Sequence, residues 1–321
     1  MKTNANEIKF RASQFGYLMT DAKGQSNKYK YQAAIENMVK YKEEYSSLNP
    51  KTKGAEKKLQ QIQKTNSLIL ELEPVKDEVL LSDTCIKTLV RVFAQERYSR
   101  YEELKNKYLD KGNAREDDSI TVVSRVLKKP FKKNKERKFN EFFQGEWDLD
   151  IREGDKITET LDTKSSWSLL TFLEACNTDL NKNYEYQGHV YMDLTGAEKH
   201  TVSYCLVNGT YTGINDEIRR LGWSMGVLDA SVETDPQFIK KVKQIERNHI
   251  FDLNGFMKEN QGFELKNEFE FDGEKYNWEF DIPFQDRICS KSFNRDENIL
   301  LEMKERAKQC RVFMNKNLFK I

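Results

Sequence analysis

The sequence predicts an α/β domain with an inserted or appended helical hairpin, and three observations lead to this prediction. Apolar residues recur at helical spacing in several stretches of the 321-residue chain, and strand-like alternation begins near Phe139. Hydrophobic residues make up 38% of the chain and aromatic residues 12%, which is enough to bury a substantial core. The sequence shows neither an internal repeat nor a long low-complexity linker, so we expect one domain over residues 1–321.

The N-terminal third is predicted to be helical. Residues 28–72 are rich in Lys, Glu and Gln, with a proline and a glycine near the middle and apolar residues at helical spacing, which indicates a charged helical hairpin. A second helix is predicted to begin at the capping residues Ser82 and Asp83. We expect it to continue to about Tyr108, before Gly112 interrupts the chain.

A change from helical to strand-like pattern follows. Residues 116–127 form a short amphipathic segment, and the basic run KKPFKKNKERK comes next, where Pro130 indicates a loop or the entrance to a strand. Two adjacent strands are predicted in EFFQGEWDLDIRE and KITETLDTKSSW, with a turn at Gly154 and Asp155.

The remaining elements are predicted from the same two periodicities. Helices are expected over 169–180 and 184–194, followed by a buried strand in SYCLVNGTYTG, so that the order is strand, strand, helix, helix, strand. Beyond these lie predicted helices over 216–221 and 235–246, an alternating segment over 264–282 with a turn at Asp272 and Gly273, and a final helix over 296–315.

The composition narrows the class of protein. The net charge is only +1, so nucleic-acid binding cannot be inferred from overall basicity. We expect a cytoplasmic protein without membrane association, because the chain lacks both an apolar run near the roughly 20 residues that a membrane span needs and a secretory signal. The five cysteines form no CxxC pair and the three histidines have no metal-binding spacing, which argues against a disulfide framework and a zinc site.

Two acids and a lysine converge on the predicted strand pair. The segment GEWD ends one strand at Asp148, and Asp162, Thr163 and Lys164 lie on the next. Clustered carboxylates bind a hard divalent cation, which neutralises charge during phosphodiester hydrolysis and lowers the pKa of an attacking water. A lysine two residues beyond an acid lies on the same strand face, so Lys164 can reach the water or the scissile phosphate. The Thr163 carbonyl is a further candidate ligand.

An acid-x-Lys triplet alone is weak evidence in a chain with 52 acidic residues. Others of this kind occur at 7–9, 21–23, 56–58 and 264–266. The triplet at 162–164 differs from them in its setting. Asp148 lies fourteen residues upstream, and downstream Gln187 and Tyr191 occupy positions i and i+4 of a predicted helix, on one helix face.

Four segments in this order resemble a known family. KGNAREDDSI, GEWDLD, LDTKSSWSLLTF and YEYQGHVYM are similar to the acidic helix, metal-binding strand, acid-x-Lys strand and Gln-x-x-x-Tyr helix of PD-(D/E)xK nucleases, in particular the lambda exonuclease and YqaJ-like viral recombinase group. The resemblance implies a restriction-endonuclease-like core, in which helices flank a central mixed β-sheet. The catalytic core would span residues 111–210, and the hairpin over 28–72 would be an insertion in a single nuclease domain.

The resemblance also implies roles for individual residues. Glu116, Asp148 and Asp162 would be catalytic carboxylates that bind the metal together with Thr163, and Lys164 would be the catalytic lysine. DNA-binding or site-organising roles are implied for Gln187, Tyr191, Arg11, Ser13, Ser165 and Ser166. The chain departs from the pattern in having Asp162 where relatives more often have Glu, and in lacking a Pro before Asp148. Asp150, two residues beyond Asp148, stays open as the alternative ligand.

The function that the resemblance implies is metal-dependent cleavage of DNA. With Mg²⁺ or Mn²⁺ as cofactor, the enzyme would degrade one strand from a linear duplex end in phage-type recombination or DNA processing. The implied partners are DNA ends, a single-strand annealing protein and further copies of the chain in a ring. The alternatives are an endonuclease of the same superfamily and an inactive DNA-binding or assembly protein with this fold. An iron–sulphur nuclease is disfavoured, because a four-cysteine cluster is missing.

Three features allow two interpretations each. Gln187 and Tyr191 suit a buried amide and a core aromatic as well as they suit a functional pair. The basic run over 128–138 suits either a solvated loop or contacts with the phosphate backbone of DNA. For Trp147 and Trp167 we expect core packing rather than base stacking.

Overall fold

The computed structural model describes residues 4–22, 26–102, 106–227, 235–261, 265, 267–271 and 273–320. The chain forms two compact units. The helical unit consists of Met1–Asn6, Tyr17–Ser99 and Glu305–Ile321, and the sheet unit of Glu7–Gly16 and Arg100–Lys304. The helical unit has apolar contacts of its own, because Phe93 and Phe319 pack with ring centroids 4.9 Å apart.

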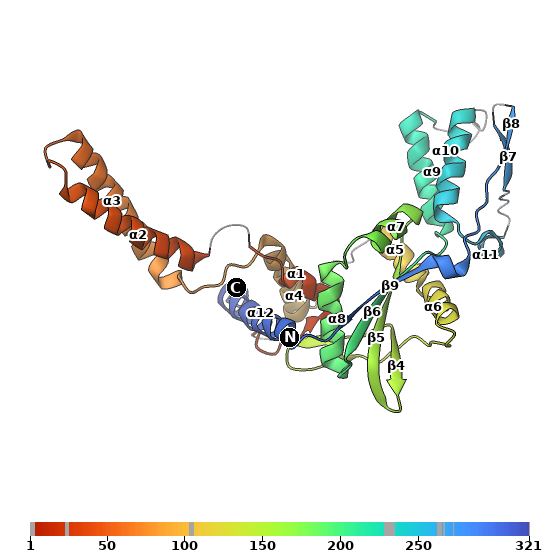
Figure 1. Ribbon diagram of the computed structural model, residues 1–321, viewed down its shortest axis with the longest axis horizontal. Helices are drawn as coiled ribbons and strands as arrows, with labels where there is room; N and C mark the ends of the chain where they lie inside the picture. The colour runs from red at the N-terminus through yellow and green to blue at the C-terminus, as the bar shows by residue number, and fades with distance from the viewer. Residues whose placement is uncertain are drawn as a thin grey trace. The chain divides into compact units, whose positions relative to one another are not determined.

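The helical unit contains the segment for which the sequence indicates a hairpin. There α2 (Asn27–Ser46) and α3 (Lys53–Leu72) pack side by side (Figure 1). Each helix begins with a side-chain cap, since Ser26 and Thr52 accept hydrogen bonds from backbone N–H groups three residues further on. The short 3-10 helix η1 (Glu73–Val75) follows α3.

Two sequence predictions about the next helices were wrong. α4 (Asp83–Tyr98) begins at the expected cap, Ser82, but ends ten residues before Tyr108, because Ser99 adopts a left-handed conformation with φ 53°. Gly112 does not interrupt the chain but lies within α5 (Lys107–Ala114), where space around its Cα is open. A helical glycine costs only about 1 kcal/mol relative to alanine, so α5 tolerates it.

The sheet unit is built on a mixed four-stranded sheet, as predicted. Its strands are β4 (Leu149–Glu153), β5 (Lys156–Ser165), β6 (Lys199–Cys205) and β9 (Ile288–Asn294), in the order β4-β5-β6-β9. β5 and β6 are parallel, whereas β4 and β9 run antiparallel to their neighbours. The expected turn between β4 and β5 is present, with Gly154 at φ 60°.

Helices cover both faces of this sheet, so the α/β class predicted from the sequence is confirmed (Figure 1). On one face α6 (Glu116–Val126) packs on Leu161 and Cys205. On the other, α7 (Leu169–Asn177) and α8 (Lys182–Thr195) lie over Val202 and Tyr204. Successive strand residues point to opposite faces, which places Asp162 and Lys164 on the α8 side.

Smaller elements complete the sheet unit. β1 (Phe10–Arg11), β3 (Phe143–Gly145) and β2 (Lys138–Phe139) form a three-stranded sheet beside α1 (Ala12–Leu18), and β7 (Glu268–Phe271) pairs with β8 (Glu274–Asn277). The remaining helices of the described residues are α9 (Tyr211–Met225), α10 (Pro236–His249), α11 (Leu253–Glu259), η3 (Phe284–Arg287) and α12 (Glu297–Asn317). From Glu305 onward, α12 belongs to the helical unit. The predicted turn residue Asp272 and the predicted strand start at residue 264 lie outside the described residues. None of the helices in the described part of the chain is long and apolar enough to cross a membrane.

Gly188 allows α8 to approach β6 and β9 closely. A Cβ at this position would overlap the rings of His200 and Phe293. We therefore expect Gly188→Ala to destabilise the protein by about 1–3 kcal/mol, as overpacking does in other cores. Thermal unfolding measures the effect. Gly112→Ala is the matched control, because it also replaces a helical glycine but meets open space, and its melting temperature is expected to stay the same or rise. Equal changes in both variants would contradict the close approach.

His200 makes stability depend on pH. It is fully buried, and its Nδ1 lies 2.8 Å from Thr160 Oγ1. Burial lowers the pKa of His200 to about 4, so the unfolded chain takes up a proton below its usual pKa near 6.5 while the folded chain does not. On its own, His200 therefore makes stability fall by about 1.4 kcal/mol per pH unit between roughly 6.5 and 4. Urea unfolding of wild type and His200→Gln across this range measures the contribution of His200 as the difference between their two slopes, and equal slopes would refute this source.

Candidate active site

Asp148, Asp162 and Lys164 come together where β4 begins. The β4–β5 register pairs Leu149 with Leu161, so Asp148, one residue earlier, lies next to Asp162. Its Oδ2 accepts hydrogen bonds from the backbone N–H of Thr163 at 2.6 Å and from the Thr163 hydroxyl at 3.1 Å. The structure thus places an acid from the start of β4 against the acid-x-Lys segment of β5.

Asp148 is buried and lies near other carboxylates, and both features affect its pKa. Burial raises the pKa of Asp148 to about 7, and the negative charges of Asp162 and Glu116 act in the same direction. The Thr163 N–H and the Lys164 ammonium oppose this shift of the Asp148 pKa. A buried acid held near other acids is stabilised by a cation, so the position favours metal binding over a structural role.

Lys164 supplies the nearest positive charge. Asp162 is 3% exposed, and its Oδ2 forms an ion pair with Lys164 Nζ. Among the described residues, that oxygen has no further hydrogen-bond donor. Burial lowers the pKa of Lys164, but the charge of Asp162, the hydrogen bond to its carboxylate and the charge of Asp148 together outweigh burial and raise this pKa above the usual value. Lys164 therefore remains an ammonium at neutral pH and acts as a donor of charge and hydrogen bonds, not as a base.

Gln187 and Tyr191 link α8 to the acids. Both side chains are buried, and Gln187 Nε2 donates to Tyr191 Oη at 2.7 Å. The same nitrogen lies 3.5 Å from Asp162 Oδ1, at the limit of a hydrogen bond. Gln187 and Tyr191 are therefore a buried amide and a core aromatic, and they also contact the candidate site.

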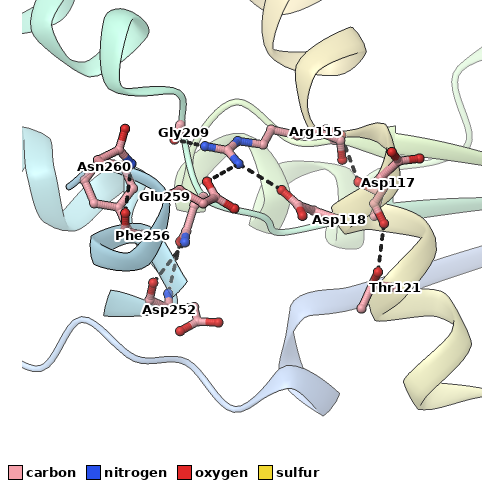
Figure 2. Close-up of polar contacts among 12 residues, drawn as sticks. Arg115, Asp117, Asp118, Thr121, Gly209, Asp252, Phe256, Glu259 and Asn260 are labelled. Atoms are coloured by element: carbon pink, nitrogen blue, oxygen red, sulfur yellow. Dashed lines mark hydrogen bonds and ion pairs between the residues drawn. The ribbon is translucent and has the colours of Figure 1, made fainter. Parts of the chain in front are cut away.

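Glu116 lies at the start of α6, and the preceding residue anchors it. Arg115 Nη1 contacts Glu259 Oε2 at 2.5 Å and Asp118 Oδ2 at 3.1 Å, while Nη2 donates to the Gly209 carbonyl at 3.1 Å (Figure 2). These contacts tie the beginning of α6 to the loop after β6 and to α11. Arg115 was not predicted from the sequence. An arginine next to an acid such as Glu116 is a common pattern on protein surfaces, so the sequence does not indicate that Arg115 is buried.

We predict that Arg115→Met lowers both stability and cleavage. Arg115 is buried, so its loss leaves the Gly209 carbonyl unpaired and should cost about 1–3 kcal/mol. Because Glu116 follows directly in the chain, cleavage should fall as well. Thermal unfolding and a DNA cleavage assay measure the two effects, with the exposed Arg219→Met on α9 as control. Equal melting temperatures for the two variants would show that Arg115 does not anchor α6.

The other predicted residues lie apart from the acids. Ser165 Oγ is 2.8 Å from Ser119 Oγ, and the backbone N–H of Ser166 donates to the Cys205 carbonyl at 2.8 Å. Arg11 and Ser13 are exposed on β1 and α1, and the contacts described for the chain do not join them to the carboxylates. The DNA-binding or site-organising roles expected for these four residues stay predictions.

Asp150, the alternative ligand, is engaged elsewhere. Its two carboxylate oxygens pair with Arg152 at 2.8 and 3.0 Å, and the Trp147 indole N–H donates to it at 3.1 Å. Burial opposes these contacts, but together they lower the pKa of Asp150. The geometry favours Asp148 as the member of the cluster. Trp147 itself is fully buried, in agreement with the expected core packing.

The donor set suits a hard divalent cation. Glu116, Asp148 and Asp162 offer carboxylate oxygens, the ligands that Mg²⁺ and Mn²⁺ prefer. Within the described residues, no three His, Cys, Asp or Glu side chains converge at metal-binding distances. Glu116 and Asp162 form ion pairs with Lys133 and Lys164 instead. The raised pKa of Asp148 shows that these carboxylates nevertheless act on one another. We therefore regard the chemistry of the cluster as fitting a metal.

A known structure shares this fold. A phage-related exonuclease from Haemophilus somnus 129PT matches with a TM-score of 0.53 and 17% identity, over 99% of this chain and 98% of that one. This chain has the same overall fold. The alkaline exonuclease LHK-Exo from Laribacter hongkongensis matches with a TM-score of 0.48 and 9% identity, over 98% and 92%, and its complex with dAMP with 0.42 and 9%, over 74% and 83%. No protein-family model and no curated protein matches the chain.

Proposed function

We propose that the chain is a metal-dependent deoxyribonuclease of the PD-(D/E)xK type. The observation that carries the proposal is the convergence of Asp148 with Asp162 and Lys164, with Glu116 close enough to shift the pKa of Asp148. Phosphodiester hydrolysis needs a cation held by acids and a nearby positive charge for the phosphate, and this cluster provides both kinds of group. The fold shared with a phage-related exonuclease supports the proposal.

Each residue would have a separate task. Glu116, Asp148 and Asp162, with the Thr163 carbonyl, would hold Mg²⁺ or Mn²⁺. The bound ion supplies charge neutralisation and lowers the pKa of a water. The Lys164 ammonium would donate to that water or to the scissile phosphate. Gln187, held by Tyr191, would orient Asp162 and keep its carboxylate on the α8 side of the sheet.

We further propose exonuclease action on one strand of a linear duplex, in phage-type recombination or DNA processing. Such an enzyme would act with a single-strand annealing protein, and copies of the chain would assemble as a ring around DNA. Light scattering of the purified protein tests the ring. An endonuclease and an inactive DNA-binding protein are the alternatives, and one assay separates all three.

The assay compares end-labelled linear duplex with closed circular DNA in Mg²⁺, Mn²⁺ and EDTA. Metal-dependent shortening of linear DNA alone is the expected result, and the position of the label gives the strand polarity. Cutting of circles would replace the exonuclease proposal with an endonuclease. A folded protein that binds DNA but cleaves neither substrate would leave the inactive binding protein as the better account.

A further inference from the structure

The basic strip, residues 128–138, is fixed along the approach to the candidate site. Its backbone is held at two points: the Phe131 N–H donates to Ser124 Oγ at 3.1 Å, and the Asn134 N–H donates to the Asp148 carbonyl at 2.7 Å. The Asn134 side chain also donates to the Trp147 carbonyl at 3.1 Å, and the Phe131 ring packs against the apolar core under α6. The strip is therefore an ordered part of the site's surroundings.

Lys133 lies between these two anchors and points to the acids. Its Nζ is 2.6 Å from Glu116 Oε2. The hydrogen bond to Glu116 raises the pKa of Lys133; burial opposes this, and the charges of Glu116, Asp148 and Glu146 add to the rise. Lys133 is thus a second ammonium at the carboxylate cluster, from a different part of the chain than Lys164. Nothing in its sequence spacing indicated this.

The Lys133–Glu116 pair is suited to exchange its partner. The two side chains are 40% and 25% exposed, and ion pairs this open to solvent contribute little to stability. Once Glu116 is engaged by a divalent ion, the Lys133 ammonium loses its anionic partner. A phosphate bound at the same carboxylates is then the nearest anion that can take over the charge-assisted hydrogen bond.

We propose that Lys133 binds a phosphate of the DNA strand at the candidate active site, and that its contact with Glu116 holds it in position until substrate arrives. This inference rests on the proposed function. The strip is strongly basic, since seven of its eleven residues are basic and one is acidic, in a chain of net charge +1. The strip would follow the strand backbone, and Lys133 would contact it next to the acids.

The test measures DNA binding in a background in which cleavage is expected to be slow. In Lys164→Ala, the dissociation constant for a short fluorescein-labelled duplex is determined by anisotropy over a range of KCl concentrations. Adding Lys133→Ala should weaken binding about tenfold and reduce the slope of log K against log salt by about 0.9, the value for one phosphate contact. Adding Lys135→Ala, an exposed lysine of the same strip, is the matched control and should have a smaller effect.

Further variants separate a phosphate contact from a structural role. Lys133→Arg keeps the charge and should restore binding, and Lys133→Gln serves in place of Lys133→Ala if the latter does not fold. Binding or a salt slope unchanged by Lys133→Ala, or changed no more than by Lys135→Ala, would overturn the inference. Wild-type cleavage is assayed in parallel. Cleavage with an unchanged Lys133→Ala slope overturns only this inference, whereas a reduced slope without wild-type cleavage supports it and overturns the proposed function.

Discussion

Lys164→Ala is expected to lower the rate of DNA cleavage by about a hundredfold to a thousandfold, the loss seen when one donor to the transition state is removed. The raised pKa of Lys164 keeps it charged at neutral pH, so the variant removes a positive charge from the proposed site of the scissile phosphate. It also leaves the buried Asp162 carboxylate without its ion-pair partner. Metal-free protein should therefore be less stable, and the divalent ion should restore part of that stability.

A gel assay of end-labelled linear duplex measures the change in rate, and thermal unfolding with and without Mn²⁺ measures the change in stability. Lys156→Ala is the control, because Lys156 lies exposed at the other end of the same strand. Wild-type rates in Lys164→Ala would place the catalytic lysine elsewhere or show that a contaminant performs the cleavage. Loss of activity in both variants would point to a general effect on β5.

Asp148→Asn is expected to abolish cleavage while raising stability. Loss of a charge-stabilising interaction of several kcal/mol corresponds to a rate decrease of about 10³-fold. The effect of Asp148→Asn on the stability of the fold is favourable. An acid whose folded-state pKa is raised lowers the stability of the fold once pH exceeds its unfolded-state pKa, and burial raises the pKa of Asp148 to about 7. The neutral amide removes that cost and can still accept from the Thr163 N–H.

Asp150→Asn is the matched comparison, because it lies two residues away and pairs with Arg152. It should leave cleavage within a few-fold of wild type and should not raise the melting temperature. Both variants are assayed in metal-free buffer for stability and in Mg²⁺ for activity. Inactivation by Asp150→Asn with full activity in Asp148→Asn would reverse the assignment of the two acids.

Much of the central part of the fold could be predicted because local patterns agreed with the packing. The strand expected in SYCLVNGTYTG was misplaced, since β6 ends at Cys205 and α9 begins at Tyr211. Alternation marked β4 and β5, and i, i+4 spacing marked α8, whose Gln187 and Tyr191 do share a buried face. The end of α4 could not be predicted, since it depends on the left-handed conformation of Ser99 and not on a glycine or proline. β9 was missed because it is a half-exposed edge strand whose apolar residues are few and scattered.

The candidate site also contains residues that could be predicted from the sequence and residues that could not. Asp148, Asp162 and Lys164 lie on two strands of a hairpin, so spacing in the sequence translates directly into proximity. Arg115 and Lys133 gain their significance from contacts with Glu259 and Glu116, which depend on loop conformation and not on periodicity. A basic, proline-containing segment has the composition of a solvated loop, and only the anchors at Phe131 and Asn134 show that it is held against the site.

The most direct measurement of the central claim is the affinity for Mn²⁺, determined by isothermal titration calorimetry for wild type, Asp162→Asn and Asp150→Asn. We predict that wild type and Asp150→Asn bind Mn²⁺ with the same stoichiometry, and that Asp162→Asn loses a site. Equal binding in all three proteins, or the absence of binding in wild type, would contradict a metal centre at Glu116, Asp148 and Asp162.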